Sequence, residues 1–176
     1  MAAATRRNWA SLGRRLLTGV ILAICAVVAA EAGGNTFLAV VTLLAVIVTF
    51  EWIKMSCRGQ SHATLFLSIL TSLASAVMFA IWNGEKALIA GAVGIVLVGL
   101  AAKFEKNNPI LVAAGITVFA LSLISTHWLR VENGTGLVTI YWLFAVVWAT
   151  DSGAYLIGSF VGGTRLAPRI SPGKTW

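Results

Sequence analysis

Hydrophobic residues run along this chain in long stretches that short polar segments interrupt. Six stretches approach the length of a bilayer crossing, which needs about 20 residues at a rise of about 1.5 Å each. They lie at roughly 16–32, 36–54, 64–82, 87–102, 110–129 and 137–158. A membrane β-barrel would alternate apolar and polar residues, and these stretches do not. The pattern therefore predicts an all-α, polytopic integral membrane bundle of about six transmembrane helices.

The polar interruptions are short and rich in Gly and Asn, as turns are. Turns are expected at 33–35, 83–84 and 133–134 on one side of the membrane and at 58–60 and 107–109 on the other. The fourth stretch carries small residues four positions apart, Ala87 with Gly91 and Ala90 with Gly94, and this spacing allows a neighbouring helix to approach closely. We expect ordinary close helix packing there.

Composition supports the membrane class. Of 176 residues, 59% are apolar and 11% are charged, and the mean hydropathy is +0.89. A soluble domain carries about 25% charged residues. The net charge of +7 suits anionic lipid headgroups and nucleotide phosphates. Because the composition is that of a membrane protein, a lipid bilayer is an expected partner. Nucleic acid is not an expected partner.

The basic residues are distributed unequally between the two sides of the membrane. With six crossings, one side receives only Lys86 and Arg130. The other side receives Arg6, Arg7, Arg14, Arg15, Lys54, Arg58, Lys103, Lys106, Arg165, Arg169 and Lys174. By the positive-inside rule this richer side is cytoplasmic, and both termini lie there. The expected organisation is a basic N-terminus at 1–15, a transmembrane region at 16–158 and a basic cytoplasmic loop at 159–176.

One acid stands out at the end of the last apolar stretch. Helical rise puts Asp151 about 21 Å along the crossing, at or just inside the cytoplasmic boundary. A carboxylate there costs a few kcal/mol unless it is paired or hydrated, so a functional role is a reasonable interpretation. The alternative is that Asp151, with Ser152 and Gly153, caps a broken helix. For Glu51, by contrast, we expect a structural ion pair with Lys54.

The expected loop after Asp151 combines cations with hydroxyls and is stiffened by proline. Such a loop can bind phosphate through charge and hydrogen bonds, although a generic juxtamembrane basic loop has the same composition. Its candidate phosphate ligands are Arg165, Arg169, Ser171, Lys174 and Thr175. A P-loop is excluded despite the sequence 173–175, because Pro168 stands where that motif needs a glycine.

Two blocks in this region resemble a known family. The sequences WATDSGAY at 148–155 and LAPRISPGKTW at 166–176 are similar to phosphatidate cytidylyltransferases, also called CDP-diacylglycerol synthases. RRLLTG at 14–19, Gly33-Gly34 with Phe37, and Glu51-Trp52 resemble the start of that family. The resemblance covers nearly the whole chain but only about the first two-thirds of a typical member.

The resemblance implies a reaction, in which phosphatidate and CTP give CDP-diacylglycerol and diphosphate with Mg²⁺. It implies that Asp151 and Lys174 are catalytic. It also implies that the substrates are bound by Ser152, Arg165, Arg169, Ser171 and Thr175. A bacterial-type inner membrane is the expected location, and a homodimer is compatible with the chain.

The family's metal-binding segment, with its Lys-Asp pair, His-Gly-Gly sequence and aspartates, is not among these residues. No metal ligand is therefore assigned here, and the Mg²⁺ ligands are expected mainly beyond Trp176. On this basis the chain is expected to be truncated and inactive alone. The alternatives are a non-catalytic membrane protein, either a remnant or a partner subunit, and a small transporter.

Overall fold

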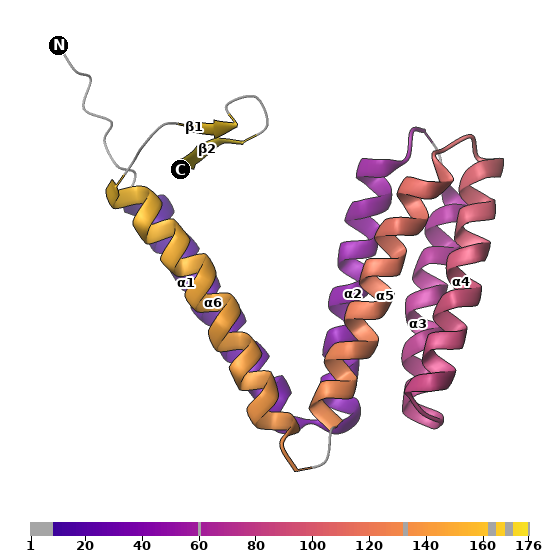
Figure 1. Ribbon diagram of the computed structural model, residues 1–176, viewed down its shortest axis with the longest axis horizontal. Helices are drawn as coiled ribbons and strands as arrows, with labels where there is room; N and C mark the ends of the chain where they lie inside the picture. Colours follow the sequence, from indigo (N-terminus) through magenta and orange to yellow (C-terminus); the bar gives the residue numbers. More distant parts are fainter. Residues whose placement is uncertain (1–8, 60, 132–133, 162–164, 168–170, 176) are drawn as a thin grey trace. The chain divides into compact units, whose positions relative to one another are not determined.

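A computed structural model describes the backbone at residues 9–59, 61–131, 134–161, 165–167 and 171–175 (Figure 1). The side chains it describes are those of 17–59, 61–131 and 134–154. The chain divides into two compact units, Met1–Leu137 and Val138–Trp176.

Six helices account for most of the described chain. They are α1 (Trp9–Ala32), α2 (Gly34–Ser56), α3 (His62–Ile81), α4 (Gly84–Phe104), α5 (Pro109–Val131) and α6 (Gly136–Val161). Five of them are long and apolar enough to cross a membrane, and α1 contains a shorter apolar stretch, Leu17–Ala32. The predicted all-α, polytopic membrane fold is therefore confirmed.

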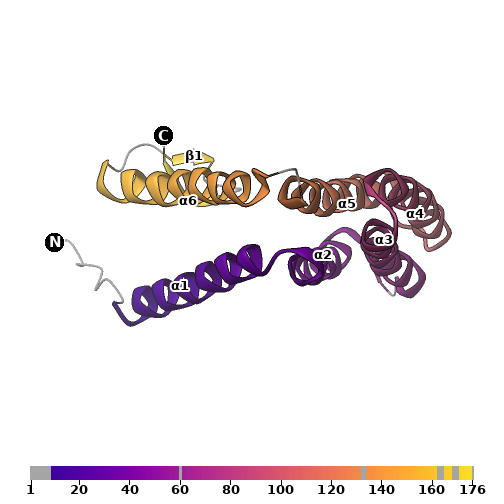
Figure 2. The ribbon, with the colours of Figure 1, turned by 90° about the horizontal axis from the view of Figure 1, so that it is seen from below.

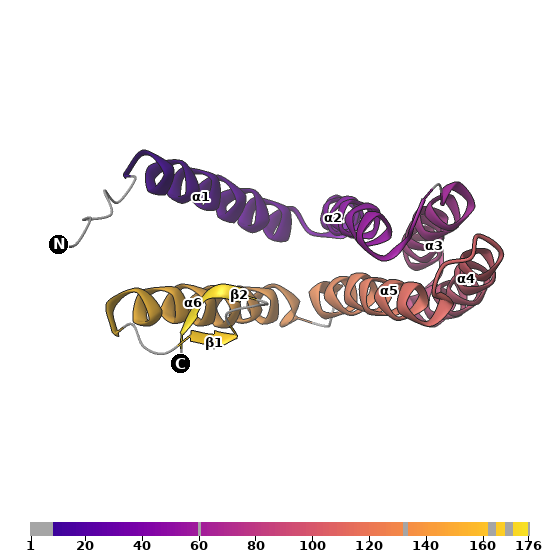
Figure 3. The ribbon, with the colours of Figure 1, turned by 90° about the horizontal axis from the view of Figure 1, so that it is seen from above.

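Helices α2 to α5 form a group in which neighbouring helices pack in the cyclic order α2–α3–α4–α5, and α3 also contacts α5 across the group. Views from below and from above both show α2 and α3 in one layer and α5 and α4 in the other (Figures 2 and 3). Buried hydroxyls line α3 and small residues line the facing side of α4. The hydroxyls of Ser68, Thr71 and Ser72 bond to carbonyls of α3 itself, which lowers the cost of burying them, whereas Ser75 Oγ is buried without a hydrogen-bond partner among the described residues.

Three glycines set how closely these helices approach. A Cβ on Gly94 would collide with Thr71 of α3, and a Cβ on Gly91 would fall 3.3 Å from Ser75 Oγ. The predicted close packing of α4 is thus confirmed, with α3 as the neighbour. A third glycine, Gly115 of α5, accommodates the indole of Trp52 from α2, which a Cβ would strike.

The described turns agree with the sequence except at the first, while residues 60 and 133 of two other expected turns lie outside the described residues. Asn83 Oδ1 accepts a hydrogen bond from Lys86 N at 3.0 Å and so caps α4. Asn108 Oδ1 likewise accepts from Ile110 N and Leu111 N ahead of α5, with Pro109 in the first helical position. The expected turn at 33–35 shrinks, because only Gly33 stands between α1 and α2; Gly33 has φ +60° and Gly34, the first residue of α2, has φ +47°.

Arg130 at the end of α5 secures this first junction. Its Nε donates to the carbonyl oxygen of Ala30, in the last turn of α1, at 2.7 Å. A Cβ on Gly33 would lie 2.7 Å from the Arg130 guanidinium. A glycine is therefore favoured at this position both by its positive φ and by the space that Arg130 occupies.

The region after α6 differs from the expected loop. Strands β1 (Arg165–Ala167) and β2 (Ser171–Thr175) pair antiparallel, with Arg165 opposite Thr175 and Ala167 opposite Ser171. The register shifts between the two pairs. Each strand of a two-stranded sheet is an edge strand, and such a strand tolerates a proline because one of its sides needs no ladder hydrogen bonds. The prolines therefore do not prevent strand pairing here.

Candidate functional site

Asp151 lies inside α6, which continues without a break from Gly136 to Val161. The alternative that Asp151 and Ser152 cap a broken helix is therefore wrong. Both side chains are exposed, and in the described part of the chain no hydrogen bond or ion pair engages the Asp151 carboxylate. The nearby Thr150 hydroxyl instead donates to Val146 O at 2.7 Å. Asp151 is thus left free to interact with something outside these residues.

An aromatic pair lies on the face of α6 that carries this acid. Phe144 and Trp148 stack with their ring centroids 5.3 Å apart and their planes 12° from parallel. Trp148 precedes Asp151 by three residues and Ser152 by four, so it shares a helix face with both. Sequence reasoning did not assign Trp148 or Phe144 to the site, although the helical spacing was a signal that could have done so.

The hairpin holds most of the predicted phosphate ligands. Arg165 belongs to β1, and Ser171, Lys174 and Thr175 belong to β2, so strand pairing brings these backbone segments together. Arg169 lies outside the described residues, as do the side chains of the other four. Gly173, Lys174 and Thr175 stand in a strand, whereas the end of a P-loop would open a helix. The exclusion of a P-loop is therefore consistent with the fold.

Glu105, which directly follows α4, has a structural role that the sequence did not reveal. Its Oε1 accepts from Ala63 N at 2.9 Å, and its Oε2 accepts from both the backbone nitrogen and the hydroxyl of Thr64. Burial alone would raise the pKa of Glu105, but these hydrogen bonds and the nearby charge of His62 outweigh it and lower the pKa. Glu105 thus caps the start of α3 from the end of α4.

The third acid, Glu51, does not form the predicted ion pair. Lys54 Nζ lies 4.4 Å from the centroid of the Phe50 ring, and within the described residues no ion pair joins it to Glu51. A cation over an aromatic face is attracted by the ring quadrupole. This contact is therefore a competing position for the lysine, and the predicted pairing is wrong.

A metal site cannot be assembled from the described side chains. Within 17–59, 61–131 and 134–154, no three His, Cys, Asp or Glu residues gather where they could hold a metal ion. Asp151 is an exposed carboxylate that no other described side chain engages. Mg²⁺ can accept such a ligand singly when phosphate oxygens and water complete its coordination.

The helices define a multi-pass membrane protein with a polar segment at the end of its sixth helix. A comparison with protein families identifies the class more closely. The chain belongs to the cytidylyltransferase family, which matches residues 13–176. The match includes α6 and the hairpin.

Curated relatives extend over nearly the whole chain. It is similar to a phosphatidate cytidylyltransferase of Brucella suis biovar 1 (strain 1330), 29% identical over 168 residues, which is 94% of this chain and 61% of the relative. A phosphatidate cytidylyltransferase of Bacillus subtilis (strain 168) is 27% identical over 173 residues, 92% of this chain and 64% of that protein. The chain thus spans about three-fifths of the length of these relatives. No solved structure matches the chain significantly.

Proposed function

We propose that this protein acts as a phosphatidate cytidylyltransferase in phospholipid biosynthesis, converting CTP and phosphatidate to CDP-diacylglycerol and diphosphate. The proposal is supported by the family match and by relatives that carry this name. The relatives are bacterial, and the basic residues favour one side of the membrane. The proposed location is accordingly the inner (plasma) membrane, with both termini in the cytoplasm.

One structural observation supports the proposed function independently of the family match. Asp151 is exposed within α6 and unengaged by the other described residues, and a hairpin holding Arg165, Lys174 and Thr175 follows that helix in the chain. Glu105, the comparable acid of the four-helix group, is engaged by hydrogen bonds within the fold. A carboxylate left unengaged in an apolar helix that precedes a cationic hairpin is suited to a charged substrate at the lipid surface.

The reaction requires a phosphatidate phosphate oxygen to attack the α-phosphorus of CTP in line. A bond forms between these two atoms, and the bond from the α-phosphorus to the bridging oxygen breaks as diphosphate leaves. Catalysis then consists mainly of positioning and of neutralising charge on the phosphoryl oxygens. In this proposal Lys174, Arg165 and Arg169 supply the positive charge. Ser152, Ser171 and Thr175 donate hydrogen bonds to phosphate oxygens.

Nucleotidyl transfer of this kind generally uses a divalent cation, and Mg²⁺ is the proposed one. When bound, it would neutralise charge on the CTP phosphates. Asp151 fits as one ligand, because its carboxylate is exposed and has no competing partner among the described residues. A homodimer stays a prediction.

The proposal can be tested with membranes from cells that express the protein from its own gene while their resident CDP-diacylglycerol synthesis is repressed. We expect radiolabelled CTP and phosphatidate to give labelled CDP-diacylglycerol. Lys174→Gln should raise the KM for CTP about tenfold or more, since hydrogen bonds to charged groups contribute about 1.5–3 kcal/mol.

The matched control is Lys103→Gln, which removes an exposed lysine from the end of α4 and should leave the KM for CTP unchanged. Equal effects of the two substitutions would contradict a specific role for Lys174. Absence of product from the unsubstituted protein, with the protein present in the membrane, would favour a non-catalytic partner or remnant.

A further inference from the structure

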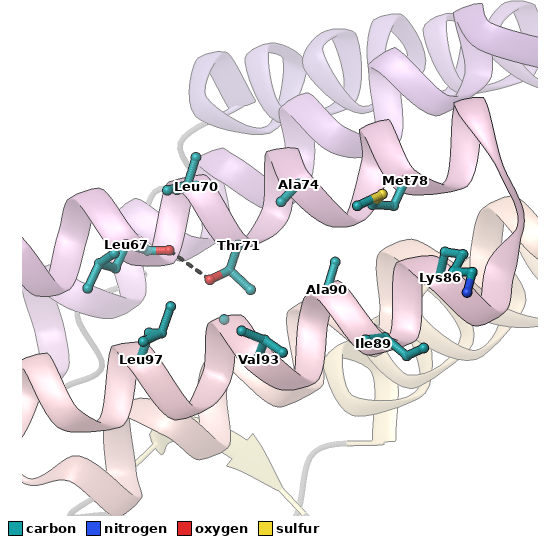
Figure 4. Close-up of a pocket in the computed structure, with 11 residues that line it drawn as sticks. Leu67, Leu70, Thr71, Ala74, Met78, Lys86, Ile89, Ala90, Val93 and Leu97 are labelled. Atoms are coloured by element: carbon teal, nitrogen blue, oxygen red, sulfur yellow. Dashed lines mark hydrogen bonds between the residues drawn. The ribbon is translucent and has the colours of Figure 1, made fainter.

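An apolar groove lies between α3 and α4 on the outer surface of the four-helix group (Figure 4). Its volume is about 360 Å³, within the range of roughly 300–1,000 Å³ that is usual for small-ligand sites. Leu67 and Leu97 line one end of the groove, and Met78 and Lys86 line the other. It is thus bordered by two membrane-spanning helices along its whole length.

The groove offers its occupant almost no polar atoms. Thr71 and Lys86 are the polar residues among those that line it. The Thr71 hydroxyl donates to Leu67 O at 2.7 Å, so its single donor proton is used inside α3. Because Gly94 has no side chain, the two helices approach closely at Thr71 and the backbone of α4 forms part of the floor. An apolar chain is therefore the fitting occupant of the groove itself.

The length of the groove corresponds to one leaflet of a bilayer. The groove covers eleven residue steps on each helix, from 67 to 78 on α3 and from 86 to 97 on α4. At about 1.5 Å per residue this is roughly 16 Å, and half of a typical hydrocarbon core of about 30 Å is roughly 15 Å. A single acyl chain of one leaflet would run from the membrane surface to the mid-plane in this space.

Lys86 marks the surface end of the groove. It lies in the first turn of α4, which begins at Gly84, and its side chain is exposed with no hydrogen bond or ion pair in the part of the chain that the structure describes. A lysine there can lay its stem along apolar atoms and extend its ammonium to the headgroups. The start of α4 adds its own preference for negative charge.

We propose that the α3–α4 groove binds an anionic glycerophospholipid of the surrounding bilayer, with one acyl chain in the groove and its phosphate on Lys86. The lipid belongs to the leaflet on the Lys86 side, away from Lys103 at the other end of α4. The phosphatidate that reacts would meet the hairpin in the opposite leaflet, so this site is distinct from the proposed active site. It requires no catalytic activity.

Charge argues against a second copy of the chain as the occupant. Two copies that face each other across this groove would be related by an axis along the membrane normal. Both Lys86 ammonium groups would then lie at the same end of one interface, where like charges repel. A phosphate group at that position is attracted instead.

A neighbouring groove supplies an internal comparison. It lies between α2 and α3, has a larger volume of about 490 Å³ and is also mainly apolar, but no cation lines it. If volume alone determined lipid retention, this groove would hold lipid at least as well. If charge determines selectivity, only the α3–α4 groove will distinguish anionic from zwitterionic lipid.

The test measures lipid retained by the purified protein in native mass spectrometry after exchange into equal amounts of phosphatidylglycerol and phosphatidylcholine with matched acyl chains. The unsubstituted protein should retain phosphatidylglycerol preferentially. Lys86→Gln should reduce that preference about fivefold, the effect of roughly one lysine at an anionic surface. Lys86→Arg and Lys103→Gln should both preserve it.

Groove-filling variants test the position of the acyl chain. Ala74→Leu occupies the α3–α4 groove and should reduce retention of phosphatidylglycerol, whereas Ala80→Leu in the α2–α3 groove should not. If Ala74→Leu fails to fold, the comparison of Lys86→Gln with Lys103→Gln still shows whether Lys86 determines the preference for phosphatidylglycerol. An unchanged lipid preference in Lys86→Gln overturns the proposal.

The second-copy alternative has its own readout. In a background with Cys25→Ser and Cys57→Ser, a cysteine at the exposed Leu70 position reports on what covers the groove. A lipid occupant predicts no disulfide-linked dimer under mild oxidation in phosphatidylglycerol bilayers. Efficient dimer formation there would overturn the proposal in favour of an interface between copies.

Discussion

The four-helix group of α2 to α5 and the sixth helix use their polar residues in different ways. In the most apolar 18-residue stretch of each of the four helices, 28–33% of the residues are buried, whereas in α6 the share is 6%. Glu105 in the first region accepts hydrogen bonds from the start of α3, while Asp151 in the second has no partner among the described residues. A carboxylate thus serves folding at the end of α4, whereas within α6 a carboxylate is left unengaged by the other described residues.

Neutralising each acid in turn tests whether Asp151 serves activity and Glu105 serves stability. Asp151→Asn should lower CDP-diacylglycerol synthesis about 100-fold or more, a loss typical of removing a group that acts in the transition state. The variant should leave thermal stability unchanged, because no contact of the described residues is lost. Membrane assays and thermal unfolding of the same preparations measure both quantities. Glu105→Gln should give the reverse pattern, and two similar patterns would refute the division of roles.

Glycine substitutions compare packing in the two regions. Gly115→Ala should destabilise the protein by about 1–3 kcal/mol, since the new methyl group would strike the Trp52 indole. Gly153→Ala in α6 should be neutral or stabilising by up to about 1 kcal/mol, since nothing lies within 4 Å of its added Cβ. Unfolding in a denaturing detergent series measures both changes. A larger loss from Gly153→Ala would contradict the difference in packing.

The dependence of thermal stability on pH tests the role assigned to Glu105. Because folding lowers its pKa from the ordinary 4.5, the carboxylate stabilises the fold fully above that value, and the contribution is lost as the pH falls through the folded-state pKa. The unsubstituted protein should therefore exceed Glu105→Gln in thermal stability at pH 7, by about 1 kcal/mol for the charged hydrogen bonds. The difference should shrink below pH 4.5. A difference that is constant from pH 7 to pH 3 would count against this role.

The smallest expected effect concerns the two loops on the Glu105 side. Asn107 Oδ1 accepts from Arg58 N at 2.8 Å, and its Nδ2 donates to Ser61 Oγ at 2.9 Å, which joins the α2–α3 loop to the α4–α5 loop. Asn107→Ala should cost about 1 kcal/mol of stability with activity retained. Asn35→Ala, an exposed position in α2, is the control. Thermal unfolding measures both, and equal values would show that the bridge contributes nothing.

The helices could be predicted from sequence because their signal is a property of single segments. Apolar length, the Asn caps before α4 and α5, and Pro109 each act locally. The role of Glu105 could not be predicted, since its partners Ala63 and Thr64 precede it by about forty residues. The Phe50–Lys54 contact was missed because an ion pair with Glu51 was equally allowed by helical spacing.

The proposed roles of all the candidate site residues stay predictions. Asp151 and Ser152 are exposed on α6, which leaves them accessible to a ligand. Strand pairing of Arg165 with Thr175 depends on contacts between separate segments, and the prolines around it favoured a loop by local rules. Trp148 was within reach of sequence reasoning, because it precedes Asp151 by about one helical turn.

The hydrogen bond from Arg130 to Ala30 has a consequence for biogenesis. Its two residues are 100 positions apart, so α1 emerges from the ribosome long before Arg130 is available to form the bond. Until α5 is inserted, this hydrogen bond cannot restrain the junction at Gly33, so the tilt of α1 relative to α2 can still change. Insertion of α5 allows the bond to form, and the bond then restrains that tilt.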